Sequence, residues 1–170
     1  MGATRIFVGT VLTLALVFGR VVAAWADNES DGDAAFQNGK YSKAVKLLLP
    51  LARRGNAVAQ RDVGLMYFDG DGLGRNSRKA VKWFSLSARQ GQIGAQVNLG
   101  IAYATGEGVL RNPAQAYVWF NAAASQRIGK SVAARFRDHM ATELSPDQLQ
   151  SAQSIAARCQ ATSYRDCSME

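Results

Sequence analysis

The feature that most constrains the fold is a stretch of sequence that occurs twice. GLMYFDGDGLGRNSRKAVKWF at residues 64–84 aligns without gaps with GIAYATGEGVLRNPAQAYVWF at residues 100–120, an offset of 36 residues. Extended outward, residues 55–90 pair with residues 91–126. The identical pairs are Gly55/Gly91, Ala59/Ala95, Gln60/Gln96, Gly64/Gly100, Tyr67/Tyr103, Gly70/Gly106, Gly72/Gly108, Arg75/Arg111, Asn76/Asn112, Ala80/Ala116, Trp83/Trp119, Phe84/Phe120, Ala88/Ala124 and Gln90/Gln126. A fixed period of this length indicates an array of stacked units, each burying its apolar face against its neighbour.

Each block predicts a pair of helices. In the first helix Ala59, Val63, Gly64 and Tyr67 fall on one face, and the second helix carries Ala80, Trp83, Phe84 and Ala88 at helical spacing. The matching residues of the second block are Ala95, Leu99, Gly100 and Tyr103, then Ala116, Trp119, Phe120 and Ala124. A glycine inside a helix costs about 1 kcal/mol relative to alanine. Its presence at Gly64 and Gly100 therefore predicts a neighbouring helix that passes too close for a side chain.

The segment between the helices has two readings. Asp-Gly-Asp-Gly at residues 69–72 is reminiscent of a calcium loop, which needs several oxygen ligands at set positions and ends in a bidentate acid. Asp69 and Asp71 become Thr105 and Glu107 in the second block, whereas the glycines are retained. The backbone geometry repeats and the carboxylates do not, so we expect a structural turn, with no metal and no cofactor.

The turn also supplies helix start signals. Gly70 and Gly106 can take the positive φ that a tight reversal requires. Asn76 and Asn112 stand where an N-cap of the second helix is expected, and Pro113 follows at the first helical position.

The residues AQ-x₂-[VL]G-x₂-Y-x₂-G-x-G-[LV]-x₂-N-x₃-A-x₂-WF-x₃-A resemble the Sel-1-like repeat, a longer-looped relative of the tetratricopeptide repeat. The resemblance implies an all-α fold, a right-handed α-solenoid of antiparallel helix pairs. Two repeats are expected at 55–90 and 91–126, after a partial N-terminal repeat at 27–54 with a shorter turn. The family often has Asp where this chain has Asn76 and Asn112, but both residue types cap helices. Some cysteine-rich members of the family are linked to penicillin binding or hydrolysis, and they have a Cys pair in each repeat. This chain lacks those pairs, so the resemblance does not extend to that activity.

Residues 127–170 fall outside the period and predict two C-terminal capping helices and a tail. The first helix places Val132, Phe136, Met140 and Leu144 on one buried stripe. The second opens with Ser145 as N-cap, Pro146 and a capping box closed by Gln148, and its buried stripe is Leu149, Ala152, Ile155 and Ala156. Cys159 and Cys167 follow, either as a disulfide in an oxidising compartment or as two free thiols.

The N-terminus has the pattern of a secretory signal peptide. A single Arg precedes the apolar run 6–19, and Ala24-Trp25-Ala26 satisfies the small-x-small cleavage rule. We expect a signal peptide at 1–26, cleavage after Ala26, and a periplasmic or secreted product. The alternative is an uncleaved membrane anchor. Removing two Arg leaves 18 basic residues against 13 acidic ones, a net charge of +5, which is no indication of nucleic-acid binding.

No catalytic set is apparent, and we predict that the chain is not an enzyme. His139 is the single histidine, and the adjacent Asp138 points elsewhere on a helix. Alignment with tetratricopeptide arrays instead predicts a partner-binding concave face. Its residues would be Arg61, Leu65, Phe68, Asp69, Val97, Ile101, Ala104 and Thr105, unless the apolar members are simply core. Lys40, Lys43, Lys46, Arg53 and Arg54 form a basic cluster, either a solvated face or a contact with an anionic glycan, lipid or acidic protein.

These features together predict an exported protein–protein interaction module. It would act as an adaptor or regulator of a cell-envelope process and bind a protein segment on the concave solenoid face. The alternatives are an envelope glycan-binding or glycan-acting protein, and a membrane-anchored scaffold held by an uncleaved N-terminal segment.

Overall fold

The computed structural model describes residues 28–126 and 130–168, and every regular element in these ranges is helical. A helical segment at residues 28–37 precedes the others. The remaining helices are α2 (Tyr41–Arg53), α3 (Ala57–Asp69), α4 (Ser77–Ala88), α5 (Ile93–Thr105), α6 (Pro113–Ala124), α7 (Lys130–Thr142) and α8 (Pro146–Ala161). The expected signal peptide at 1–26 lies outside the described residues. Within the described part of the chain, no helix is both long and apolar enough to span a membrane.

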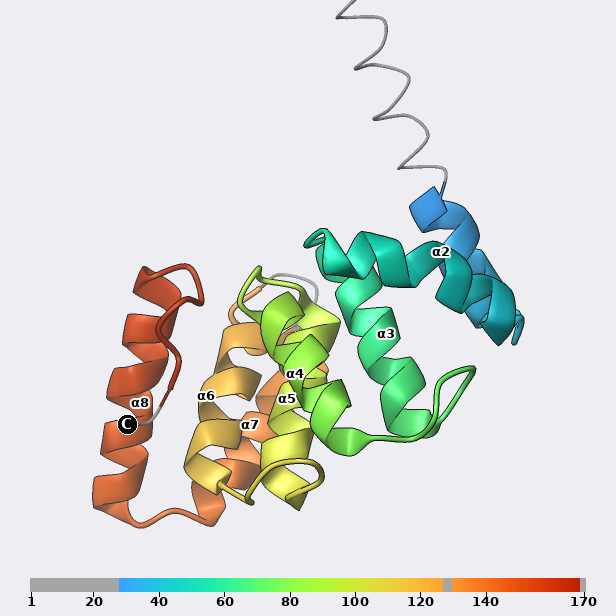
Figure 1. Cartoon of the computed structure of the whole chain (residues 1–170). Coiled ribbons are helices and arrows are strands. Elements are labelled where there is room, and N and C mark those ends of the chain that lie inside the picture. The colour runs from blue at the N-terminus through green and yellow to red at the C-terminus, as the bar shows by residue number, and fades with distance from the viewer. Residues whose placement is uncertain (1–27, 127–129, 169–170) are drawn as a thin grey trace, which may run out of the picture.

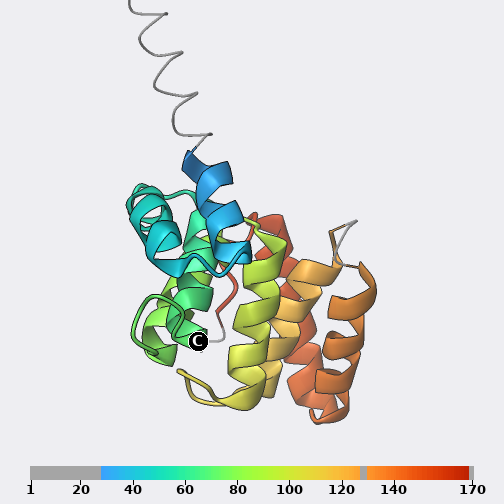
Figure 2. The same ribbon diagram turned by 90° about the vertical axis from the view of Figure 1, so that its right-hand side faces the viewer.

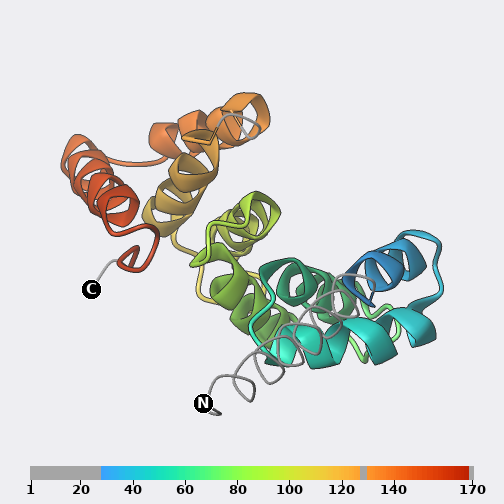
Figure 3. The same cartoon turned by 90° about the horizontal axis from the view of Figure 1, so that it is seen from above.

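The helices stack in sequence order into a curved array. Figure 1 shows the succession from residues 28–37 and α2 at one end to α8 at the other, and Figures 2 and 3 show it from two further directions. Each helix from α2 to α6 packs against the next one, and α8 packs against α6. The predicted fold class, an all-α solenoid of antiparallel helix pairs, is confirmed.

The two helices of each pair interlock through a glycine and a large side chain. A Cβ atom at Gly64 would lie 2.5 Å from the Phe84 ring, and one at Gly100 would lie 2.6 Å from the Phe120 ring. Both phenylalanines are 1% exposed. The prediction of a close approach at these glycines is confirmed, and the approaching group is an aromatic ring of the partner helix.

The same contact defines the partial N-terminal repeat. A Cβ atom at Gly32 would lie 2.5 Å from Leu48 of α2, which is fully buried. Gly32 and Leu48 are 16 residues apart, whereas Gly64 and Phe84 are 20 apart, because the turn between residues 28–37 and α2 is four residues shorter. The array therefore begins with a complete helix pair that has a shorter connection.

The turns and caps also form as the sequence predicts. Gly70 and Gly106 end α3 and α5 with φ of 89° and 82°. The Asn76 side chain accepts a 3.0 Å hydrogen bond from the Lys79 amide, and the Asn112 side chain accepts one of 3.0 Å from the Gln115 amide.

Buried glutamines join consecutive repeats. Gln60 donates to the Ala52 carbonyl at the end of α2 (3.1 Å) and accepts from Gln90 (2.7 Å). One period later, Gln96 donates to the Ala88 carbonyl (3.2 Å) and accepts from Gln126 (2.9 Å). Each glutamine gives a second hydrogen bond to a carbonyl at a helix end, which also accepts from the amide of Gly55 or Gly91, and the same links recur in both repeats.

The C-terminal end differs from the prediction in one respect. The stripe assigned to α7 is wrong at two positions, since Val132 is 57% exposed and Phe136 is 41% exposed. The buried residues of α7 are Ala133 and Met140, which face α6. The cause is the position of α8, which packs against α6 and leaves the outer side of α7 uncovered. Phe136 instead stacks on Phe120 of α6, with ring centroids 5.2 Å apart.

Helix α8 matches the prediction except at Leu149, which is half-buried against the main core. Ser145 and Gln148 form the capping box, and Ala152, Ile155 and Ala156 are buried. Beyond α8, the tail turns back, with Cys159 and Cys167 joined in a disulfide.

Candidate functional site

A small hollow lies where the helices α3 and α5 run side by side. It has a volume of about 150 Å³ and is lined by Leu65, Phe68, Asp69, Phe84, Asn98 and Ile101. We call it the α3–α5 pocket. Four of the residues predicted for the concave face, namely Leu65, Phe68, Asp69 and Ile101, meet in it.

Phe84 and Asn98 also line the pocket but were not predicted as site residues. Phe84 was assigned to the core, and it does fill the space above Gly64 while one edge of its ring reaches the pocket. Asn98 could have been found, because it precedes Ile101 by three residues and therefore shares its helical face.

The walls of the pocket are apolar and its rim is acidic. Phe68 and Phe84 pack at a tilt with ring centroids 6.3 Å apart. Asp69 is exposed at the edge. Burial raises the pKa of the Asp69 carboxyl, and the negative charges of Asp71 and Glu107 raise it further, against the opposing effect of Arg75. The arrangement suits an apolar side chain that is followed by a basic group.

The other predicted site residues have structural contacts. Thr105 donates to the Ile101 carbonyl (3.0 Å) and accepts from the Glu107 amide, so it stabilises the end of α5. Val97 and Ala104 are half-buried and pack against the main core. Neither they nor Thr105 lines the α3–α5 pocket.

Arg61 is held in an ion-pair cluster that the sequence analysis missed. Its Nε donates to Oδ1 of Asp62 at 2.7 Å, and its Nη2 lies 3.8 Å from Asp33. Asp62 is fully buried, and its Oδ2 accepts no hydrogen bond among the described residues. Burial raises the pKa of the Asp62 carboxyl, although Arg61 opposes this. The guanidinium therefore compensates the charge of a buried carboxyl.

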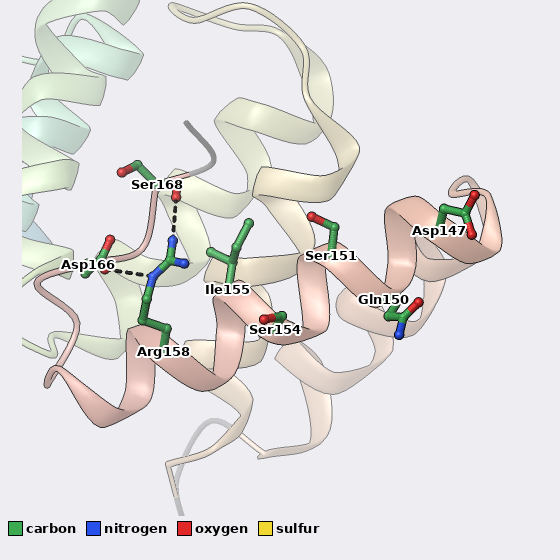
Figure 4. A pocket seen from close by; sticks show the side chains of 8 residues that line it. All are labelled: Asp147, Gln150, Ser151, Ser154, Ile155, Arg158, Asp166 and Ser168. Carbon is green, nitrogen blue, oxygen red and sulfur yellow. Dashed lines mark hydrogen bonds and ion pairs between the residues drawn. The ribbon is translucent and has the colours of Figure 1, made fainter.

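A larger hollow lies between α8 and the tail. It has a volume of about 740 Å³ and is broad and polar, as Figure 4 shows. Its one basic side chain, Arg158, is already engaged by Asp166 (2.7 Å) and by the Ser168 carbonyl (3.4 Å). The single histidine, His139, is exposed on α7 with Nε2 3.7 Å from Glu143. Among the described residues, no three His, Cys, Asp or Glu side chains are grouped so as to hold a metal ion.

The interlocked helix pairs, the glycine turns and the glutamine links define a tetratricopeptide-like helical-repeat protein. The model of the Sel1 repeat matches residues 57–92 and 93–127. The chain therefore contains two Sel1 repeats, as its resemblance implied.

Solved structures support the same assignment. One is a protective antigen present in uropathogenic Escherichia coli strains that displays an SLR fold (TM-score 0.77, 26% identity over 84% of this chain). Another is a Sel1 repeat protein from Oxalobacter formigenes (TM-score 0.64, 27% identity over 83% of this chain). This chain spans 31% and 58% of their lengths. No curated protein sequence matches significantly.

Sel1 repeat proteins are generally interaction modules of the non-catalytic scaffold type.

Proposed function

We propose that this protein is an exported adaptor that holds a protein segment in the α3–α5 pocket. The observation that carries the proposal is the convergence of Leu65, Phe68 and Ile101 around a hollow sized for one apolar side chain. These side chains come from consecutive repeats, so the pocket exists only in the stacked array. A binding site between repeats is the arrangement by which solenoids present extended surfaces.

The proposal also specifies the chemistry of the segment. An apolar residue fills the pocket, and a Lys or Arg next to it faces the carboxylate of Asp69. Opposite charges at the edge of an apolar site give orientation and fast association more than raw affinity.

The test is affinity capture from an envelope extract with paired variants. Leu65→Asp with Ile101→Asp places two charges in the pocket, and Asn98→Tyr fills it without removing any apolar packing. The matched control is Leu110→Asp, because Leu110 is 88% exposed and lies in the turn before α6, outside the pocket. Circular dichroism checks that each variant folds.

A protein retained by wild type and by Leu110→Asp, but lost with both pocket variants, supports the adaptor function. Retention by all the folded variants shows that the pocket is not the binding site. If wild type retains no protein, the adaptor proposal fails.

Export is part of the proposal and has a separate test. It rests on the N-terminal pattern of an apolar run followed by Ala24-Trp25-Ala26. Mass spectrometry of protein recovered from cells should give an N-terminus at Asp27. An intact N-terminus contradicts cleavage and favours the membrane-anchored scaffold.

A further inference from the structure

The basic residues of α2 recur on α4 at the repeat period. Lys43, Lys46 and Arg53 of α2 correspond, 36 residues later, to Lys79, Lys82 and Arg89 of α4. We call these six residues the basic face. All six side chains are exposed. The pattern stops there, because the equivalent positions of α6 are Gln115, Val118 and Ser125.

The two rows of charges lie on the same side of the array. Helices α2 and α4 both pack against α3, and Trp83 of α4 packs against the core cluster that contains Leu48 and Leu51 of α2. Equivalent positions of consecutive repeats in a solenoid face the same direction. Along each row the three cations span ten residues, or about 15 Å. The basic face is therefore a grid of two rows on one side of the array.

This grid is poorly compensated by the protein itself. No Asp or Glu occurs between Asp33 and Asp62, or between Asp71 and Glu107. Lys43 approaches Asp31 at 4.0 Å, and Lys79 lies 5.2 Å from the centroid of the Tyr67 ring. The ion pairs of the described residues involve none of the remaining four cations, Lys46, Arg53, Lys82 and Arg89. Like charges gathered on one side of the array repel each other, so a negative partner stabilises this arrangement.

An apolar residue also repeats inside the grid. Pro50 of α2 and Leu86 of α4 are equivalent, and each lies between the second and third cation of its row. Pro50 is exposed, and Leu86 is 50% exposed. Cations surrounding an exposed apolar side chain are typical of surfaces that lie on an anionic bilayer. A soluble polyanion would contact the cations but gain nothing from Leu86.

We infer that the basic face of α2 and α4 docks the protein on an anionic lipid bilayer. The cations face the lipid phosphates, and Leu86 enters the headgroup region. The α3–α5 pocket is lined by residues of α3 and α5 and by the buried Phe84 of α4, and none of the six cations lines it. The docking does not depend on what the pocket binds.

The test is sedimentation with vesicles of phosphatidylcholine, with and without phosphatidylglycerol. The protein is used in the form recovered from cells. Neutral vesicles serve as reference, because any apolar N-terminal segment binds both kinds alike. We expect preferential binding to the anionic vesicles that is lost between about 0.1 M and about 1 M salt, where the screening length falls from about 10 Å to about 3 Å.

The decisive variants remove equal charge from different places. Lys46→Gln with Lys82→Gln should lower partitioning onto anionic vesicles by about 25-fold, a factor of about five per cation. The control, Arg135→Gln with Arg165→Gln, removes two exposed cations outside the basic face and should change it less than about twofold. Leu86→Ser should lower vesicle binding about tenfold and leave binding to heparin, a soluble polyanion, unchanged.

Three results would overturn the inference. The first is equal binding to neutral and anionic vesicles. The second is equal weakening by the two charge variants, which would mean that net charge alone attracts the protein. The third is a pair of results: Leu86→Ser binds vesicles as wild type does, and Lys46→Gln with Lys82→Gln abolishes heparin binding. This pair would identify a soluble polyanion as the ligand.

Discussion

Gly64→Ala tests whether the interlocked helix pair determines stability. The added Cβ would lie 2.5 Å from each of two ring carbons of Phe84, whereas carbon atoms pack at about 3.5–4.0 Å. The ring must therefore move by about 1 Å. It has little room, because Phe84 is 1% exposed and packs against Phe68. Overpacking of this kind costs about 1–3 kcal/mol, and the better helix propensity of alanine returns up to about 1 kcal/mol. We expect a net loss of about 1–2 kcal/mol in the free energy of unfolding.

The assay is urea denaturation followed by circular dichroism. The matched control is Gly74→Ala, because a Cβ at Gly74 has no neighbour within 4 Å, and its stability should be unchanged or raised by about 0.4–1 kcal/mol. The double variant Gly64→Ala with Phe84→Leu should lose at least about 1 kcal/mol less stability than the sum of the two single variants, since the two sites are in contact. A Gly64→Ala protein as stable as wild type, or additive effects in the double variant, would refute the reasoning.

Three further predictions concern stability. Asn76→Ala should cost about 1 kcal/mol in urea denaturation, because the cap of α4 is lost. The double variant Cys159→Ser with Cys167→Ser loses the disulfide, which should lower the free energy of unfolding by about 2–3 kcal/mol. In thermal denaturation, wild type treated with a reducing agent should be destabilised as much as this variant. The raised pKa of Asp62 means that the folded state holds this proton more tightly than the unfolded state. Protonation of Asp62 therefore stabilises the fold fully below about pH 4, and this stabilisation is lost as pH rises through the raised pKa. In urea denaturation at a series of pH values, the free energy of unfolding of wild type should decline over this range, and that of Asp62→Asn should not.

Residues that act through local backbone geometry were predictable from the sequence. Asn76, Asn112 and Ser145 precede helices at cap positions, and all three accept the predicted hydrogen bonds. Gly64 and Gly100 stand at identical places on a repeated helical face, so a steric reason was the simplest interpretation. For the three caps, the sequence within three residues contains the whole cause, whereas the glycines were found because the repeat places them twice at the same position.

Contacts that depend on how distant helices stack were not predictable in the same way. Val132 has the spacing of a buried residue, but the side of α7 on which it lies is left uncovered because α8 packs elsewhere. Arg61 was assigned to a partner-binding face by alignment with tetratricopeptide arrays, which ignores its neighbour Asp62. The opposite signal was present, because Asp62 falls on the same helical stripe as Ala59, Val63 and Met66, all of which are buried. A charge on a buried stripe requires a partner, and the adjacent Arg61 supplies it.

The side-chain links between repeats have a consequence for how such a chain can gain repeats by duplication. Gln90 reaches back 30 residues to Gln60, and Arg75 reaches forward 32 residues to Glu107 (2.8 Å). The equivalent pairs recur one period later, as in Arg111 with Glu143. Both halves of each link therefore lie within one period of each other. Duplicating a 36-residue block copies both side chains of such a link together with the helix pair. An added repeat would therefore pack against its neighbour without new complementary mutations.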